Sequence, residues 1–176
     1  MKIVLVINDM SVGGAQRVVS SLANYYLAIG NEVTVVTLQN LEVRYPLDKK
    51  IKQITLRSSI LCKSFGKILF LPVFARELKK IIDIENPDKT LSFLVRSNLV
   101  HTLSKFFGNS KAINLSERTI SSLYYGGGLK ASIMKTLIKT LYPKADNILA
   151  ISEGVKESLC SMHIDVSKIN VVFNPV

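Results

Sequence analysis

The sequence predicts an α/β protein built on a mainly parallel sheet of about seven strands. Short apolar runs alternate with segments of helical periodicity from one end of the 176 residues to the other. Several runs are continuous in Val, Ile and Leu, which is typical of strands that are buried on both faces of a sheet. Since no repeat, low-complexity tract or linker interrupts the alternation, the sequence indicates one domain over residues 1–173.

The expected strands are short runs rich in apolar and β-branched residues. They span Lys2–Ile7, Glu32–Leu38, Ile51–Leu56, Lys89–Leu94, Ala112–Leu115, Asn147–Ile151 and Asn170–Phe173.

The expected helices fill the gaps between the strands. The first helix ends at Gly30, so that the first two strands and this helix form a β-α-β crossover. Another spans Pro72–Ile84, because proline is favoured in a first turn and Asn86-Pro87 breaks the pattern after it. Further helices are expected at Asn98–Phe107, Leu129–Tyr142 and Glu153–Met162.

Composition narrows the class of protein and of partner. With 48% hydrophobic and 20% charged residues the chain reads as a folded globular protein. No apolar run reaches the roughly 18 residues of a spanning helix, and the first strand is too short for a signal peptide. The net charge of +10 favours an anionic partner. Nucleic acid is not expected, because aromatics make up only 7% and lysines outnumber arginines.

Cysteines and metal ligands carry little signal in this sequence. Cys62 and Cys160 lie far apart without a close-spaced partner, so we expect two buried free thiols in a reducing cytosol. No metal-ligand cluster is present, and a metal-independent reaction is expected.

Ligands of a parallel sheet bind at the carboxyl ends of its strands, which singles out four loops. In the first loop, Gly13, Gly14 and Ala15 stand where the backbone turns into the first helix. Small residues let a ligand approach the amide groups there, and the helix dipole favours an anion such as a diphosphate. A tight structural turn is the alternative, and neither a dinucleotide fingerprint nor a Walker lysine loop is present. The four loops are Asn8–Gln16, Leu94–Asn98, Ser116–Gly128 and Ile151–Gly154.

The segment Gly13-Gly14-Ala15-Gln16-Arg17 resembles the GGA-x-R loop of family-4-type retaining glycosyltransferases. Ala145–Val155 is similar to that family's stretch before the last helix, and Ile169–Val176 to its final strand and interdomain linker. The resemblance covers the whole chain in order. It implies a Rossmann-like three-layer sandwich, the N-terminal, acceptor-side half of a two-domain GT-B enzyme. Residues 174–176 would begin the linker, and the donor-binding C-terminal domain would lie beyond the chain.

The same resemblance implies roles for particular residues. The diphosphate of a nucleotide-sugar, the donor substrate, would lie at Gly13, Gly14, Ala15 and Arg17, and no cofactor is expected. The acceptor would be bound by side chains that follow two other strands. These are Arg96, Asn98, Ser116, Glu117 and Arg118.

The catalytic group is left open among Glu117, Arg118 and His101. Many relatives carry a histidine near the reacting sugar where this sequence has Arg118. An arginine stays charged and cannot act as a base, although it can hold an acceptor phosphate or steady a leaving group. The structural alternatives are a surface ion pair between Glu117 and Arg118, and a packed, hydrogen-bonded His101.

Two segments that mix basic and apolar residues favour a membrane surface over a merely solvated face. They are Cys62–Lys80 and Leu129–Tyr142. Clustered lysines and arginines attract anionic lipids by about 1 kcal/mol each. The sequence therefore predicts a cytoplasmic protein, peripheral on the inner face of a membrane, whose acceptor is a glycan, for example a polyprenyl-linked one.

The expected function is transfer of a sugar from a nucleotide-sugar to a glycan acceptor, lipid-linked, in surface polysaccharide or lipopolysaccharide biosynthesis. The chain without its donor domain is expected to be inactive. Two alternatives remain open: a nucleotide-sugar epimerase of the same GT-B architecture, and a non-enzymatic α/β binding module for acidic ligands.

Overall fold

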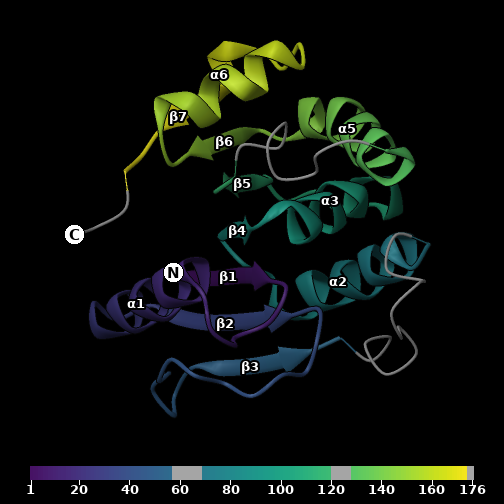
Figure 1. Ribbon diagram of the computed structural model, residues 1–176. Helices are drawn as coiled ribbons and strands as arrows, with labels where there is room; N and C mark the ends of the chain where they lie inside the picture. Colours follow the sequence, from purple (N-terminus) through teal and green to yellow (C-terminus); the bar gives the residue numbers. More distant parts are fainter. Residues whose placement is uncertain (57–68, 120–127, 174–176) are drawn as a thin grey trace.

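The computed structural model describes residues 1–56, 69–119 and 128–173, which form a seven-stranded sheet (Figure 1). The strand order is β3-β2-β1-β4-β5-β6-β7, and every neighbouring pair is parallel. The predicted α/β class with a parallel sheet is thereby confirmed. The strands are β1 (Lys2–Ile7), β2 (Glu32–Thr37), β3 (Lys52–Thr55), β4 (Lys89–Phe93), β5 (Asn114–Glu117), β6 (Asn147–Ala150) and β7 (Ile169–Val171).

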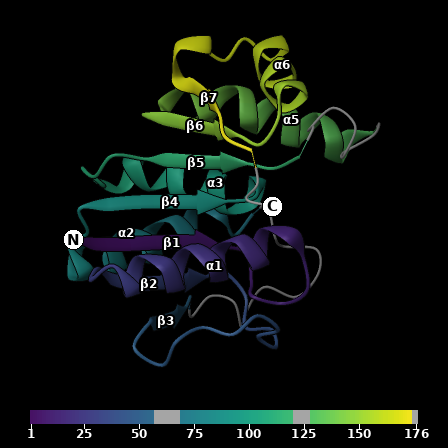
Figure 2. The same cartoon turned by 90° about the vertical axis from the view of Figure 1, so that its left-hand side faces the viewer.

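The helices divide unequally between the two faces of the sheet. Helix α1 lies over β1 and β2 on one face, whereas α2, α3 and α5 cover the other, and α6 lies beside β6 and β7 (Figures 1 and 2). Figure 2 looks onto α1, and of the helices that the structure describes no other lies on this side. The bounds are α1 (Gly14–Ala28), α2 (Leu71–Glu85), α3 (Val95–Leu103), α5 (Leu129–Leu141) and α6 (Glu153–Ser161), with 3-10 turns η2 (Ser104–Phe107), η3 (Tyr142–Lys144) and η4 (Val166–Lys168).

The core has two parts because the central strands are apolar on both faces. Alternate residues of β1 belong to different clusters: Leu5 packs under α1, whereas Val6 packs under α2 and α3. Phe74 and Tyr142 are the largest side chains buried on the α2 and α3 face. Over the part of the chain that the structure describes, no helix combines the length and apolar character that crossing a membrane requires.

Two predicted helix ends are confirmed with their cause. Helix α1 ends just before Gly30, whose φ of 84° is a left-handed conformation that glycine adopts without strain. Helix α2 ends at Glu85, because the next residue, Asn86, takes a left-handed φ of 44° and Pro87 follows.

Most other predicted bounds differ from the structure by one or two residues, and the differences around β4, α3 and β5 change where polar residues lie. The strand expected to run to Leu94 ends at Phe93, because Leu94 takes φ 72° and the chain enters α3 at Val95 instead of Asn98. The fifth strand begins at Asn114 instead of Ala112, whose carbonyl accepts the hydroxyl of Thr90. The fifth strand also runs on to Glu117 instead of ending at Leu115, so Ser116 and Glu117 lie inside a strand, and Asn98 lies inside α3. Residues 62–68 of the segment Cys62–Lys80, which was expected at a membrane, and residues 174–176, the predicted start of a linker, lie outside the described residues.

Candidate active site

Four strand ends meet at the carboxyl edge of the sheet, as the sequence predicts. Hydrogen bonds hold the segments that follow these strands together. The side chain of Ser97 donates from Oγ to Asn8 Oδ1 at 2.8 Å. Two backbone bonds, each of 3.3 Å, run from Leu94 N to the Ser116 carbonyl and from Ile151 N to the Glu117 carbonyl.

The loop between β1 and α1 is organised by Asp9. Its Oδ1 accepts the backbone N–H of Ser11 at 3.1 Å, the Ser11 hydroxyl and Gln16 Nε2 at 3.3 Å. Helix α1 then begins after Gly13 without a side-chain cap. Since the first amide groups of a helix have no partner within the helix, those of α1 are open to an anion.

The predicted donor residues differ in their exposure. Gly14 and Arg17 are exposed, Gly13 is half-buried, and Ala15 is packed into the core under α1. A Cβ at Gly14 would meet no atom within 4 Å, so its side faces open space. The structure thus leaves room for a ligand at Gly14.

The segment after β4 is a single strained residue. Leu94 connects β4 directly to α3 with φ 72° and ψ 146°, a region that costs a residue with a side chain of order 1–3 kcal/mol. Asn98, predicted as an acceptor contact, points inward and is fully buried. Arg96 is half-buried, with its guanidinium 5.3 Å from the ring centroid of Phe74.

The end of β5 sends neighbouring side chains to opposite faces, as strand geometry requires. Glu117 is fully buried on the side of α3 and α5, where Tyr142 Oη donates to its carboxylate. Arg118 lies on the α1 side, where its Nη1 donates to Ser116 Oγ at 3.3 Å. A surface ion pair between Glu117 and Arg118 is therefore not the arrangement that the structure has.

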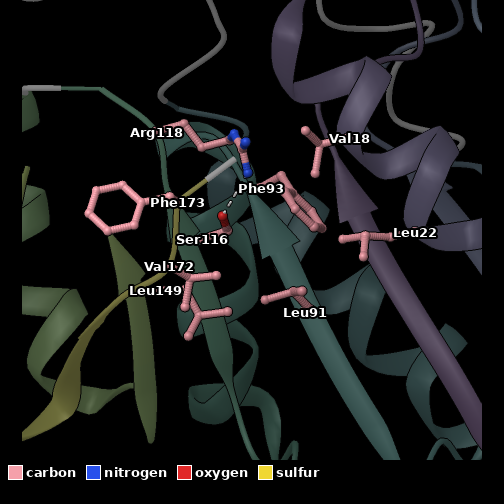
Figure 3. Close-up of a pocket in the computed structure, with 9 residues that line it drawn as sticks. All are labelled: Val18, Leu22, Leu91, Phe93, Ser116, Arg118, Leu149, Val172 and Phe173. Atoms are coloured by element: carbon pink, nitrogen blue, oxygen red, sulfur yellow. Dashed lines mark hydrogen bonds between the residues drawn. The ribbon is translucent and has the colours of Figure 1, made fainter. Parts of the chain in front are cut away.

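Arg118 borders an apolar pocket on the open side of the sheet (Figure 3). Its guanidinium stands 5.9 Å from the ring centroid of Phe93, and Val18 of α1 faces it across the pocket. Burial lowers the pKa of Arg118 and the Glu117 carboxylate opposes this, so the side chain stays a cation at neutral pH. At about 110 Å³ the pocket is smaller than the roughly 300 Å³ of an ordinary ligand site. It can accommodate one part of a larger ligand.

The fourth loop, the cysteines and the possible metal ligands show no sign of a reactive site in the described residues. Ser152, in the fourth loop, caps α6 by accepting the N–H of Val155. Cys160 is half-buried, whereas a buried thiol was expected, and Cys62 lies outside the described residues. Within residues 1–56, 69–119 and 128–173 no cluster of His, Cys, Asp and Glu could hold a metal ion.

His101 is a packed residue in this structure. It is fully buried, with Nε2 2.9 Å from Thr90 Oγ1 and Nδ1 3.1 Å from Ser92 Oγ. Burial lowers its pKa from 6.5 to about 3, with Lys105 adding to the shift and Asp146 opposing it. The imidazole is neutral at physiological pH and is not exposed to substrate.

This shift gives a testable pH dependence of stability. Between pH 6.5 and about 3 the unfolded chain protonates His101 while the folded chain does not, so stability falls as the pH is lowered. We expect a loss of up to about 1.4 kcal/mol per pH unit from this group, measured by urea unfolding at several pH values. His101→Gln should flatten the profile, whereas exposed His163→Gln should not; equal slopes in all three proteins would refute the assignment.

Comparison with known proteins decides the family. The sequence model of Glycosyltransferase Family 4 matches residues 12–176. The chain belongs to this family. A curated relative is N-acetylgalactosamine-N,N'-diacetylbacillosaminyl-diphospho-undecaprenol 4-alpha-N-acetylgalactosaminyltransferase of Campylobacter jejuni. It is 30% identical over 177 residues, which cover 99% of this chain and 48% of that protein.

Solved structures match the family-4 chain in fold. The lipopolysaccharide outer core galactosyltransferase WaaB has a TM-score of 0.72 at 22% identity and is matched over 100% of this chain and 46% of its own. Sucrose-phosphate synthase of Thermosynechococcus elongatus has a TM-score of 0.75 at 15% identity, and the match covers 99% of this chain and 48% of that protein. A UDP-N-acetylglucosamine 2-epimerase of Rickettsia bellii has a TM-score of 0.63 at 10% identity, and the match covers 97% of this chain and 44% of that protein. These likenesses confirm the Rossmann-like fold of a GT-B half, and the chain spans about half the length of the proteins it matches.

Sequence reasoning missed three residues that shape the candidate site. Asp9 and Ser11 form an Asx-type turn, whose Asp-x-Ser spacing is a readable local signal. Tyr142 was assigned only as the last residue of a helix, and no local pattern indicates that its hydroxyl meets Glu117.

Proposed function

We propose that the protein transfers a sugar from a nucleotide-sugar to a glycan acceptor carried on a lipid, with retention at the anomeric carbon. The observation that carries the proposal is the 30% identity, over nearly the whole chain, to an enzyme named for transfer to a diphospho-undecaprenol-linked sugar. Surface polysaccharide or lipopolysaccharide assembly is the setting that this relationship favours. The reaction would use the nucleotide-sugar as donor and need no cofactor.

The geometry supports a division of roles at the carboxyl edge. The uncapped start of α1, with Gly13 and Gly14, would accept the leaving diphosphate through backbone amides, a preorganised form of charge stabilisation. Arg118 would hold an anionic group of the acceptor against the apolar pocket beside Phe93. Arg17, exposed in the next position but one after Ala15, would face the donor from α1.

Peripheral association with the cytoplasmic face of a membrane is part of the proposal. Helices α2 and α5 both follow strands and so begin at the carboxyl edge, where Leu69 is 82% exposed and Leu129 80% exposed. Arg76 and Lys80 are exposed on α2. The exposed leucines would insert into the membrane, and the neighbouring cations would attract anionic lipids. Together these contacts would bring the site to a lipid-linked acceptor.

The test uses the full-length protein with a panel of nucleotide-sugars, and measures release of free nucleotide with and without undecaprenyl-diphosphate-linked sugar in anionic vesicles. We expect release that depends on the lipid-linked acceptor, and none from residues 1–176 alone. Release without any acceptor would favour hydrolysis or epimerase chemistry, and product analysis would identify an epimer. Binding of acidic ligands without release would favour the binding module.

A further inference from the structure

Glu117 stands at the centre of a buried hydrogen-bond network that the proposed chemistry does not use. Its side chain is fully buried, and its Oε1 accepts three donors from the next two residues. These are the backbone N–H of Arg118 at 3.0 Å, the backbone N–H of Thr119 at 3.1 Å and the Thr119 hydroxyl at 2.9 Å. The carboxylate therefore fixes the first turn of the chain as it leaves β5.

The other oxygen of Glu117 is anchored to two further elements. Oε2 accepts the hydroxyl of Tyr142 in η3, and Tyr142 Oη in turn accepts Asn98 Nδ2 of α3 at 3.1 Å. Asn98 Oδ1 accepts Ser92 Oγ of β4 at 2.8 Å. All four side chains are fully buried. A satisfied polar network in a low-dielectric interior is rigid, because each broken bond leaves a costly buried group.

The turn that Glu117 fixes decides where the Arg118 guanidinium lies. The backbone N–H of Arg118 is bonded on the helix side of the sheet, whereas its side chain runs to the open side, against Phe93 and Ser116 (Figure 3). A carboxylate with no exposed surface and both oxygens occupied by donors of the same chain has no path to a substrate atom. We propose that Glu117 is a positioning residue that sets the place of Arg118 for acceptor binding and takes no part in the chemistry itself.

This inference rests on the proposed function only for the role of Arg118. The hydrogen bonds stand without it, so the two can fail separately. Burial raises the pKa of Glu117, while bonds from Tyr142, Thr119 and Arg118 oppose the rise. Because the folded-state pKa is raised, ionisation costs stability as the pH rises through it. Glu117→Gln avoids that cost, and its amide oxygen can still accept the donors of Arg118 and Thr119.

The experiment compares Glu117→Gln and Glu117→Ala in the full-length protein, with exposed Glu157→Gln as the matched control. Hydrogen exchange at the amides of Arg118 and Thr119 reports the turn whatever the reaction is. We expect Gln to keep both amides protected and kcat within about threefold of wild type, since its amide oxygen keeps the bonds that Oε1 accepts and only the bond from Tyr142 is lost. Ala should speed their exchange at least about tenfold and raise the acceptor KM about tenfold, with kcat changed less.

Three results would overturn the proposal. A loss of kcat of about 100-fold in Glu117→Gln with normal amide protection would make the carboxylate a chemical participant. Unchanged exchange and KM in Glu117→Ala would show that the turn holds without it. If Glu117→Ala does not fold, Tyr142→Phe gives the third test, and unchanged exchange at Arg118 and Thr119 there would contradict the network's role. If Glu117→Ala speeds amide exchange as expected but the wild-type protein transfers no sugar, the proposed function is refuted and the role of Glu117 in the turn is not.

Discussion

If Arg118 binds an anionic group of the proposed acceptor, Arg118→Ala is expected to raise the KM for that acceptor by about 100-fold in the full-length protein, because truncating one partner of a desolvated charge pair costs of order 2–5 kcal/mol. The guanidinium is half-buried against Phe93 and borders an apolar pocket, where water competes less for an anion than at an open surface. The measurement is the steady-state rate at varied acceptor and saturating donor.

Two further variants separate charge from geometry. Arg118→Lys keeps the cation but loses the planar fork that matches a phosphate, so we expect an intermediate loss of about tenfold. Lys49→Ala removes an exposed cation just before β3, at the opposite edge of the sheet, and should leave the acceptor KM within about twofold, since exposed charges contribute little. An unchanged acceptor KM in Arg118→Ala would exclude this residue from acceptor binding.

The fold was predictable because its signals are local. Continuous apolar runs such as Lys2–Ile7 need burial on both faces, and each was found as a strand of one parallel sheet. Gly30 and Asn86 end their helices through backbone conformations that their residue types favour. The errors that changed where site residues lie arose at Leu94 and around β5, where long-range contacts override local preference: no sequence pattern indicates that a leucine will take φ 72°.

The location of the candidate site could be predicted from the sequence, whereas the direction and contacts of its individual side chains could not. Small residues before α1 and polar residues after β4 and β5 do lie at one edge of the sheet. The side to which each side chain points depends on strand parity at β5, and Glu117 was expected in a loop. Its partner Tyr142 lies 25 positions away in sequence, and their contact depends on the tertiary packing that places η3 against α3 and α5.

Substitution by alanine is expected to affect the stability of the protein differently at the neighbouring residues Gly13 and Gly14. A Cβ at Gly14 would meet no protein atom within 4 Å and alanine favours a helix, so Gly14→Ala should fold with unchanged or slightly raised stability. The added methyl group would occupy the space through which a diphosphate approaches the amides of α1. We expect kcat/KM for the donor to fall at least about tenfold, by loss of anion stabilisation.

Gly13→Ala acts on the protein itself. Its Cβ would stand 2.3 Å from Gln16 Oε1, so the Gln16 side chain must move away from Asp9, which organises the loop. Because the end of a glutamine side chain can move at little cost, we expect only a small loss of thermal stability, together with lower activity. If the clash is the cause, Gly13→Ala with Gln16→Ala should be less harmful than the sum of the two single changes, by at least about 0.5 kcal/mol. Strict additivity would contradict the clash, and full activity in Gly14→Ala would mean that no ligand approaches this turn.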